Sequence, residues 1–121
     1  RNYKRAYQRI MTSNFQHSSL ANGKWYTLSL VEQLGNIGSE VHRTLRAKNT
    51  GKPFDNAALR ALELFDLTLM DSRWKKRLKE IARAREIFCD IVYGKSEYGI
   101  SLEDLDRYFY YFAYAARLGN L

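Results

Sequence analysis

The chain has 121 residues, 45% of them hydrophobic and 27% charged, which is the composition of an ordinary globular domain and excludes a disordered chain. Its 20 lysines and arginines against 13 acidic residues give a formal net charge of +7, which favours polyanionic partners without specifying a fold. No apolar run reaches the roughly 20 residues of a membrane helix, and the single cysteine, Cys89, cannot form an internal disulfide. We therefore expect a cytoplasmic protein that makes no membrane contact.

The sequence predicts an all-α fold. Proline occurs once, and apolar residues recur at three- and four-residue steps along most of the chain. Residues 1–24 are expected to form a short amphipathic N-terminal helix and a linker, because "SNFQHSSLANGK" has the composition of a loop. Residues 25–121 are expected to form an antiparallel up-down-up-down four-helix bundle, since the connections between successive helices are short.

The first long helix is predicted to begin near Ser29, which forms a capping-box pair with Glu32, and to end near Lys48. Gly35 and Gly38 lie inside this helix, where each costs about 1 kcal/mol relative to alanine. They predict either the close approach of a neighbouring helix or a kink. The expected buried stripe consists of Leu30, Leu34, Ile37, Val41 and Leu45.

The second helix, "AALRALELFDLTLM" at 57–70, is expected to be capped by Asp55 or Asn56. It is apolar over most of its circumference and leaves only a narrow polar stripe that contains Glu63 and Asp66. This pattern predicts the most buried element of the fold.

The third and fourth helices follow after short turns. The third is expected to run from Arg73 to Tyr93 and to fold back against the second. The fourth is expected to be capped by Ser101 with Asp104 and to end near Leu118. Its expected core residues are Leu102, Leu105, Phe109, Phe112 and Ala116.

The stretch "RWKKRLKEIARARE", residues 73–86, is strongly basic. Most of its cations fall outside the apolar arc of the expected helix, so a solvated face is one interpretation. They concentrate at the helix start, where the helix dipole disfavours positive charge, and this position favours a surface that follows a phosphate backbone. The candidate nucleic-acid-binding residues are Lys4, Arg5, Arg9, Arg73, Lys75, Lys76, Lys79 and Arg83.

Arg85 differs from these cations because it lies within the apolar arc. A desolvated guanidinium requires carboxylate partners, and the second helix offers Glu63 or Asp66. We expect Arg85 to be buried in an ion pair that fixes the helix register; a pocket residue is the alternative.

The segment "RYFYYFAYAAR" carries tyrosines that point away from the expected core. Exposed tyrosines beside arginines can anchor a protein partner or stack on unpaired bases. Packing of the N-terminal helix over them and self-association are the other interpretations. The candidate partner-binding residues are Arg107, Tyr110, Tyr111, Tyr114 and Arg117.

Catalytic signatures are missing from the sequence. Two histidines, His17 and His42, and one cysteine do not form a metal-ligand pattern, and there is no glycine-rich phosphate loop or nucleophile elbow. We expect no enzymatic activity, no cofactor and no metal.

The strings "LVEQLGNIGSEVHRTL", "RALELFDLTLMDSRWKKRLKEIARAREIFCD" and "LDRYFYYFAYAAR" resemble short bacterial helical-bundle proteins of unassigned function. The set is associated with accessory proteins of reverse-transcriptase cassettes of the diversity-generating retroelement type. The resemblance implies a basic bundle that oligomerises and binds RNA or a ribonucleoprotein containing the reverse transcriptase. It assigns no role to individual residues. The alternative is a protein-only adaptor that oligomerises through the tyrosine-bearing helix.

Overall fold

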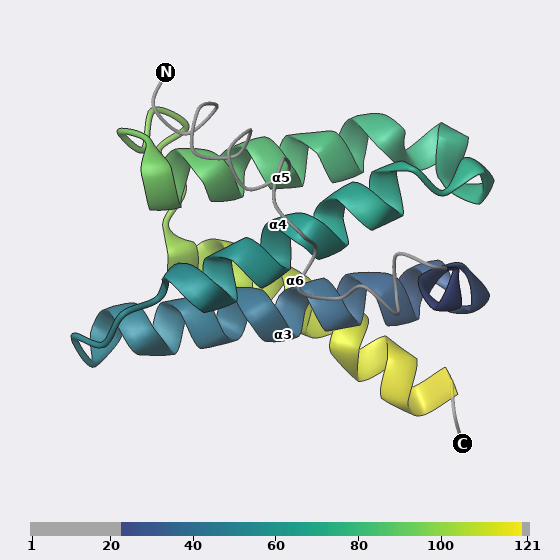
Figure 1. The fold of residues 1–121 in the computed structure, drawn as a ribbon, viewed down its shortest axis with the longest axis horizontal. Coiled ribbons are helices and arrows are strands. Elements are labelled where there is room, and N and C mark those ends of the chain that lie inside the picture. The colour runs from purple at the N-terminus through teal and green to yellow at the C-terminus, as the bar shows by residue number, and fades with distance from the viewer. Residues whose placement is uncertain (1–22, 120–121) are drawn as a thin grey trace.

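The computed structural model describes residues 23–119, which form helices and connecting turns only (Figure 1). Within this range the all-α prediction is confirmed, and the contacts between helices fit a bundle. The predicted N-terminal helix lies outside the described residues. The elements are the 3₁₀ turn η1 (Lys24–Thr27), α3 (Leu30–Asn49), α4 (Asp55–Leu69), the 3₁₀ segment η2 (Ser72–Arg77), α5 (Leu78–Tyr93) and α6 (Leu102–Gly119).

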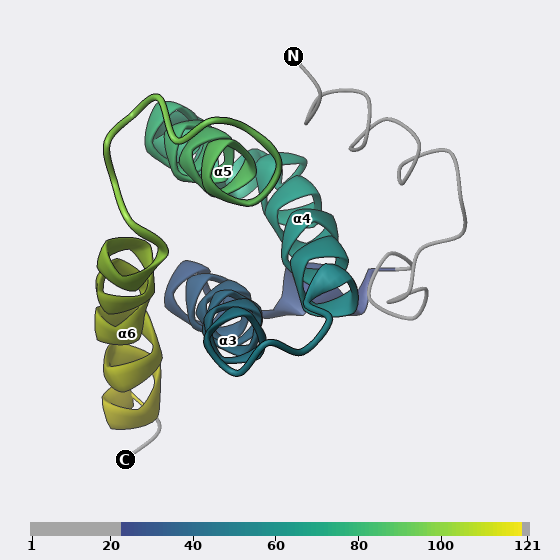
Figure 2. The ribbon, with the colours of Figure 1, turned by 90° about the vertical axis from the view of Figure 1, so that its left-hand side faces the viewer.

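The four α-helices surround a common core, but their contacts are unequal. Helix α3 packs extensively against both α6 and α4, whereas α5 and α6 touch over few residues. Figure 2 shows α6 and α4 on either side of α3, with α5 across the core. The C-terminal turns of α6 extend past α3 (Figures 1 and 2). The seam between α3 and α6, where the two helices meet, is therefore tightly packed. The seam between α5 and α6 is open, because these helices make few contacts.

Two of the predicted caps are confirmed. The Ser29 hydroxyl accepts from the Glu32 backbone N–H, and the Glu32 carboxylate accepts from the Ser29 N–H, at 3.2 and 2.9 Å. Ser101 and Asp104 make the same reciprocal pair before α6. Sequence spacing determines such caps because both partners belong to one turn of chain.

The predicted cap of α4 is wrong. Neither Asp55 nor Asn56 caps the helix, because helical geometry already begins at Asp55 and the preceding residue is Phe54, which makes no side-chain cap bond. The Asp55 carboxylate lies instead in the first turn, where the helix dipole favours a negative charge.

The two glycines of α3 lie where α6 approaches closely, so the first of the two predicted explanations is confirmed. A Cβ added to Gly38 would lie 2.7 Å from the Cβ of Phe109, and one added to Gly35 would lie 3.2 Å from the Cα of Ala113. Larger residues at either position would push α6 away from α3.

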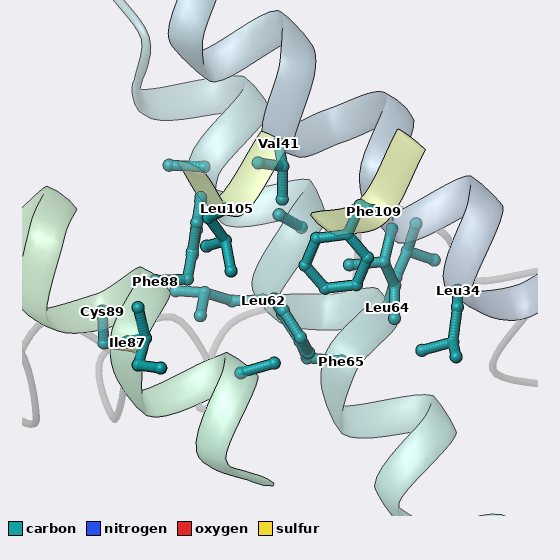
Figure 3. Close-up of a cluster of buried hydrophobic side chains, with 14 of the residues drawn as sticks. Leu34, Val41, Leu62, Leu64, Phe65, Ile87, Phe88, Cys89, Leu105 and Phe109 are labelled. Carbon is teal, nitrogen blue, oxygen red and sulfur yellow. The ribbon is translucent and has the colours of Figure 1, made fainter. Parts of the chain in front are cut away.

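Helix α4 supplies the centre of the core, as predicted, since residues 61–68 are all buried. The Phe65 ring packs 6.0 Å from Phe88 of α5 and 5.7 Å from Phe109 of α6, measured between ring centroids. Figure 3 shows these side chains converging from three helices. Of the core residues expected in the first and fourth helices, Leu30, Phe112 and Ala116 are only half-buried.

The predicted third helix is wrong at its start. Residues 72–77 form 3₁₀ turns with a kink at Trp74 (φ −103°, ψ 26°), and the α-helix begins only at Leu78. A tertiary and a local hydrogen bond favour this geometry: the Trp74 indole donates to Gln33 at 2.9 Å, and the Asp71 side chain, which caps η2, accepts from the Arg73 backbone N–H at 3.1 Å. The helical periodicity of the sequence could not predict this start, because it carries no information about contacts with another helix.

A buried polar cluster explains the kink. Gln33, fully buried, donates from one side-chain nitrogen to the Trp25 carbonyl and to Asp71, both at 3.0 Å. The Trp25 indole donates to Thr68 at 3.1 Å. Hydrogen bonds from the Arg73 side chain, together with those from Gln33 and the Arg73 backbone, lower the pKa of Asp71 to about 2. This cluster joins η1, α3, α4 and η2.

Candidate nucleic-acid interface

The basic stripe consists of four exposed cations on η2 and α5: Lys75, Lys76, Lys79 and Arg83. None of the four forms an ion pair with any residue between 23 and 119. Their charges are available to a ligand. The other predicted members of this surface, Lys4, Arg5 and Arg9, lie outside the described residues.

Arg73 is exposed, as expected from the sequence, but unlike the cations of the basic stripe it is held by several contacts. Its guanidinium lies 2.7 Å from the Asp71 carboxylate, donates to the Leu28 carbonyl at 2.7 Å, and lies over the Trp74 ring at 4.4 Å. These contacts tie η2 to the chain segment before α3. Arg73 thus belongs to the polar cluster of the fold rather than to the basic stripe.

Folding leaves most basic side chains exposed but buries many of the acidic ones. Fourteen of the sixteen lysines and arginines in residues 23–119 are exposed, but only five of the thirteen acidic residues are. Five acidic side chains are buried: Glu40, Glu63, Asp66, Asp71 and Asp90. The accessible surface is consequently more basic than the composition indicates.

A pocket of about 490 Å³ lies at the open seam between α5 and α6. Its existence follows from the sparse contact of these helices. Arg83, the last cation of the basic stripe, stands at the pocket rim. The lining residues are Glu80, Arg83, Ala84, Ile87, Ile100, Asp104, Leu105 and Tyr108.

Tyr108 forms one aromatic wall of this pocket. Its hydroxyl donates to Glu80 at 2.7 Å, and its ring packs edge-on against Phe109 and Phe112. Burial, and then the hydrogen bond to Glu80, raises the pKa of Tyr108. Hydrogen bonds from Arg77 and then from Tyr108 lower the pKa of Glu80. The tyrosine side chain is therefore held in place.

The predicted tyrosine surface is exposed. Tyr110, Tyr111 and Tyr114 are 57%, 70% and 49% accessible, and the rings of Tyr110 and Tyr114 stack 6.4 Å apart. Arg107 is exposed and pairs with Asp104 one turn earlier, and Arg117 is exposed near the end of α6. These side chains belong to the helix whose last turns extend past α3 (Figure 1).

A second groove, of about 770 Å³, lies along the contact between α3 and α6. Its lining includes Arg43 and Arg46 of α3 and Tyr110 and Arg117 of α6. Arg43 also pairs with Glu40 at 3.0 Å. Arg43 and Arg46 are not among the predicted site residues, because their proximity to α6 arises only when two distant segments pack.

Arg85 is mostly buried and paired, as predicted. Its Nε donates to Asp66 Oδ1 at 3.2 Å, and the two side chains are 15% and 11% exposed. Of the two predicted partners, Asp66 makes this contact. The pair joins α5 to α4, which agrees with a structural role.

Residues 23–119 contain no cluster of three or more His, Cys, Asp and Glu side chains able to hold a metal ion. In the same range, no helix is long and apolar enough to cross a bilayer. Burial raises the pKa of the Cys89 thiol to about 11, which keeps this group protonated at neutral pH and unreactive as a nucleophile. No known protein family, curated protein or solved structure matches the chain.

Proposed function

We propose that this protein is a non-enzymatic, cytoplasmic accessory protein that binds RNA or a ribonucleoprotein through the basic stripe. One observation supports the proposal above others: the stripe holds four adjacent exposed cations without ion-pair partners in the part of the chain that the structure describes. Phosphate groups are the ligands that such a row of charges attracts most generally.

The position of the stripe strengthens this argument. The cations lie at and before the first turns of α5, where the positive end of the helix dipole makes them unfavourable. Stability of the helix does not account for their placement. A bound polyanion would offset this repulsion.

The test is a variant in which Lys75, Lys76 and Lys79 are changed together to glutamine. We expect it to melt within a few degrees of the native protein because exposed charges contribute little to stability. Its affinity for single-stranded RNA, measured by fluorescence anisotropy across a salt series, should fall. The slope of log K against log salt should become shallower by about 2, since each phosphate contact with a single strand contributes roughly 0.7.

A matched control changes Lys48, Lys52 and Lys95 to glutamine. These lysines are also exposed and lie away from the stripe in sequence, in α3 and in two loops. The control removes the same net charge and should retain most of the affinity. An equal loss in both triple variants would show that net charge alone drives binding, and no RNA binding at low salt would refute the proposal.

The tyrosine surface supports a second candidate, a protein-only adaptor that oligomerises through α6. Tyr111, the most exposed of the three tyrosines at 70%, would lie at its centre. Light scattering after size exclusion should then show an oligomer that persists in high salt and dissociates in Tyr111→Ser. A monomer at all concentrations would reject this candidate.

Two finer assignments accompany the proposal. We propose that the four helices follow an antiparallel up-down-up-down order, which the short connections at 50–54, 70–71 and 94–101 support. A link to reverse-transcriptase cassettes stays a prediction from the sequence resemblance. Co-purification of a reverse transcriptase and its RNA with the native protein would test it.

A further inference from the structure

We propose that the pocket between α5 and α6 receives an unstacked base of a single nucleic-acid strand whose phosphates lie along the basic stripe. This inference rests on the proposed function and gives it a partner class, single-stranded rather than duplex nucleic acid. The stripe and the pocket adjoin each other because Lys79 and Arg83, the part of the stripe on α5, share a face of that helix with the pocket wall.

Helical spacing connects the two parts. Lys79 and Arg83 are four residues apart and therefore stand one above the other on α5. Ile87, a further four residues along the same face, is buried at the pocket wall. A strand that follows the lysines reaches the pocket at Arg83.

The pocket suits a base in shape and surface. Its walls are mostly apolar, and its volume of about 490 Å³ lies within the roughly 300–1,000 Å³ of typical small-ligand sites. Tyr108 supplies an aromatic side chain already fixed by its hydrogen bond to Glu80. Bases stack readily on aromatic side chains, whatever their sequence.

Charge at the rim directs phosphate and base to different places. Glu80 and Asp104 line the pocket, and although Arg77 and Arg107 pair with them, both carboxylates disfavour a phosphate inside it. The phosphates are attracted instead to the stripe cations, which have no ion-pair partner among residues 23–119. A base carries no charge and can enter the apolar pocket.

A site that binds phosphates on the stripe and a base in the pocket should discriminate against duplexes. The bases of a duplex are stacked and paired, and moving one into a pocket costs a few kcal/mol of unstacking energy. The stripe alone would favour a duplex, which has the higher density of phosphate charge. A preference for the single strand therefore indicates that the pocket binds a base. Salt-dependent binding of single strand or duplex indicates that the stripe binds phosphates.

The experiment measures affinities for a fluorescein-labelled RNA of about 12 nucleotides and for its duplex, using the full chain at low salt. Ala84→Leu fills the pocket from the α5 wall without a penalty in helix propensity. We expect native protein to prefer the single strand, and the variant to lose about tenfold in single-strand affinity, the equivalent of one stacked base, with duplex binding unchanged. Ile100→Trp fills the pocket from the loop before α6. This variant replaces Ala84→Leu in the measurement if Ala84→Leu folds poorly.

Several results would overturn the inference. Equal affinity of native protein for single strand and duplex would do so without any variant. A folded pocket variant with unchanged single-strand affinity would also overturn it. So would a loss of single-strand affinity, without a loss of duplex affinity, in Tyr111→Ser, because that result would place the bases on the tyrosine surface. In each of these cases stripe-dependent binding survives and only the pocket is rejected, whereas an absence of all binding rejects the proposed function itself.

Discussion

Replacement of Gly38 by alanine should destabilise the bundle although alanine is the better helix former. The new Cβ would lie 2.7 Å from the Phe109 Cβ, and ordinary contacts begin near 3.4 Å, so α6 must shift by roughly 0.7 Å along its most extensive interface. Overpacking of this kind costs about 1–3 kcal/mol, and the gain in helix propensity returns about 1 kcal/mol. We expect a net loss of up to about 2 kcal/mol.

Urea denaturation followed by circular dichroism measures this change. Asn36→Ala is the control, because Asn36 is exposed on the same helix and its replacement gains propensity without any overlap. Gly35→Ala, with a closest approach of 3.2 Å, should fall between the two variants. A Gly38→Ala protein at least as stable as the native one would refute the claim that α3 and α6 are in tight contact at this position.

Two further variants test the polar contacts of the fold. Arg85→Ala should cost about 3 kcal/mol in urea denaturation, because it removes one partner of a mostly buried ion pair with Asp66; a loss below about 1 kcal/mol would contradict the structural role. Asp71 has its pKa lowered from 3.8 to about 2, so its contribution of roughly 2 kcal/mol is present above pH 4 and disappears as the pH falls through 2. In Asp71→Asn that contribution should be absent at neutral pH, and the acid-induced loss of stability should be correspondingly smaller; identical acid unfolding profiles would show that Asp71 is not responsible.

The sequence by itself determined the features that depend on neighbouring residues. The Ser29 and Ser101 caps each lie within one helical turn, and the apolar circumference of α4 marks it as buried wherever its neighbours are placed. The same reasoning located Arg85, since an arginine within an apolar arc must find a carboxylate. These signals are local, and the chain carries them before it folds.

Only the tertiary structure decided how distant segments combine. The 3₁₀ geometry around Trp74 depends on Gln33, 41 residues away, and Arg73 is withdrawn from the basic stripe by contacts of the same cluster. The α5–α6 pocket exists because those two helices make few contacts, and packing enlarges the excess of exposed positive charge by burying five acidic side chains. Helical periodicity shows which face of a helix is apolar, but the contacts of that face depend on packing between segments far apart in the chain.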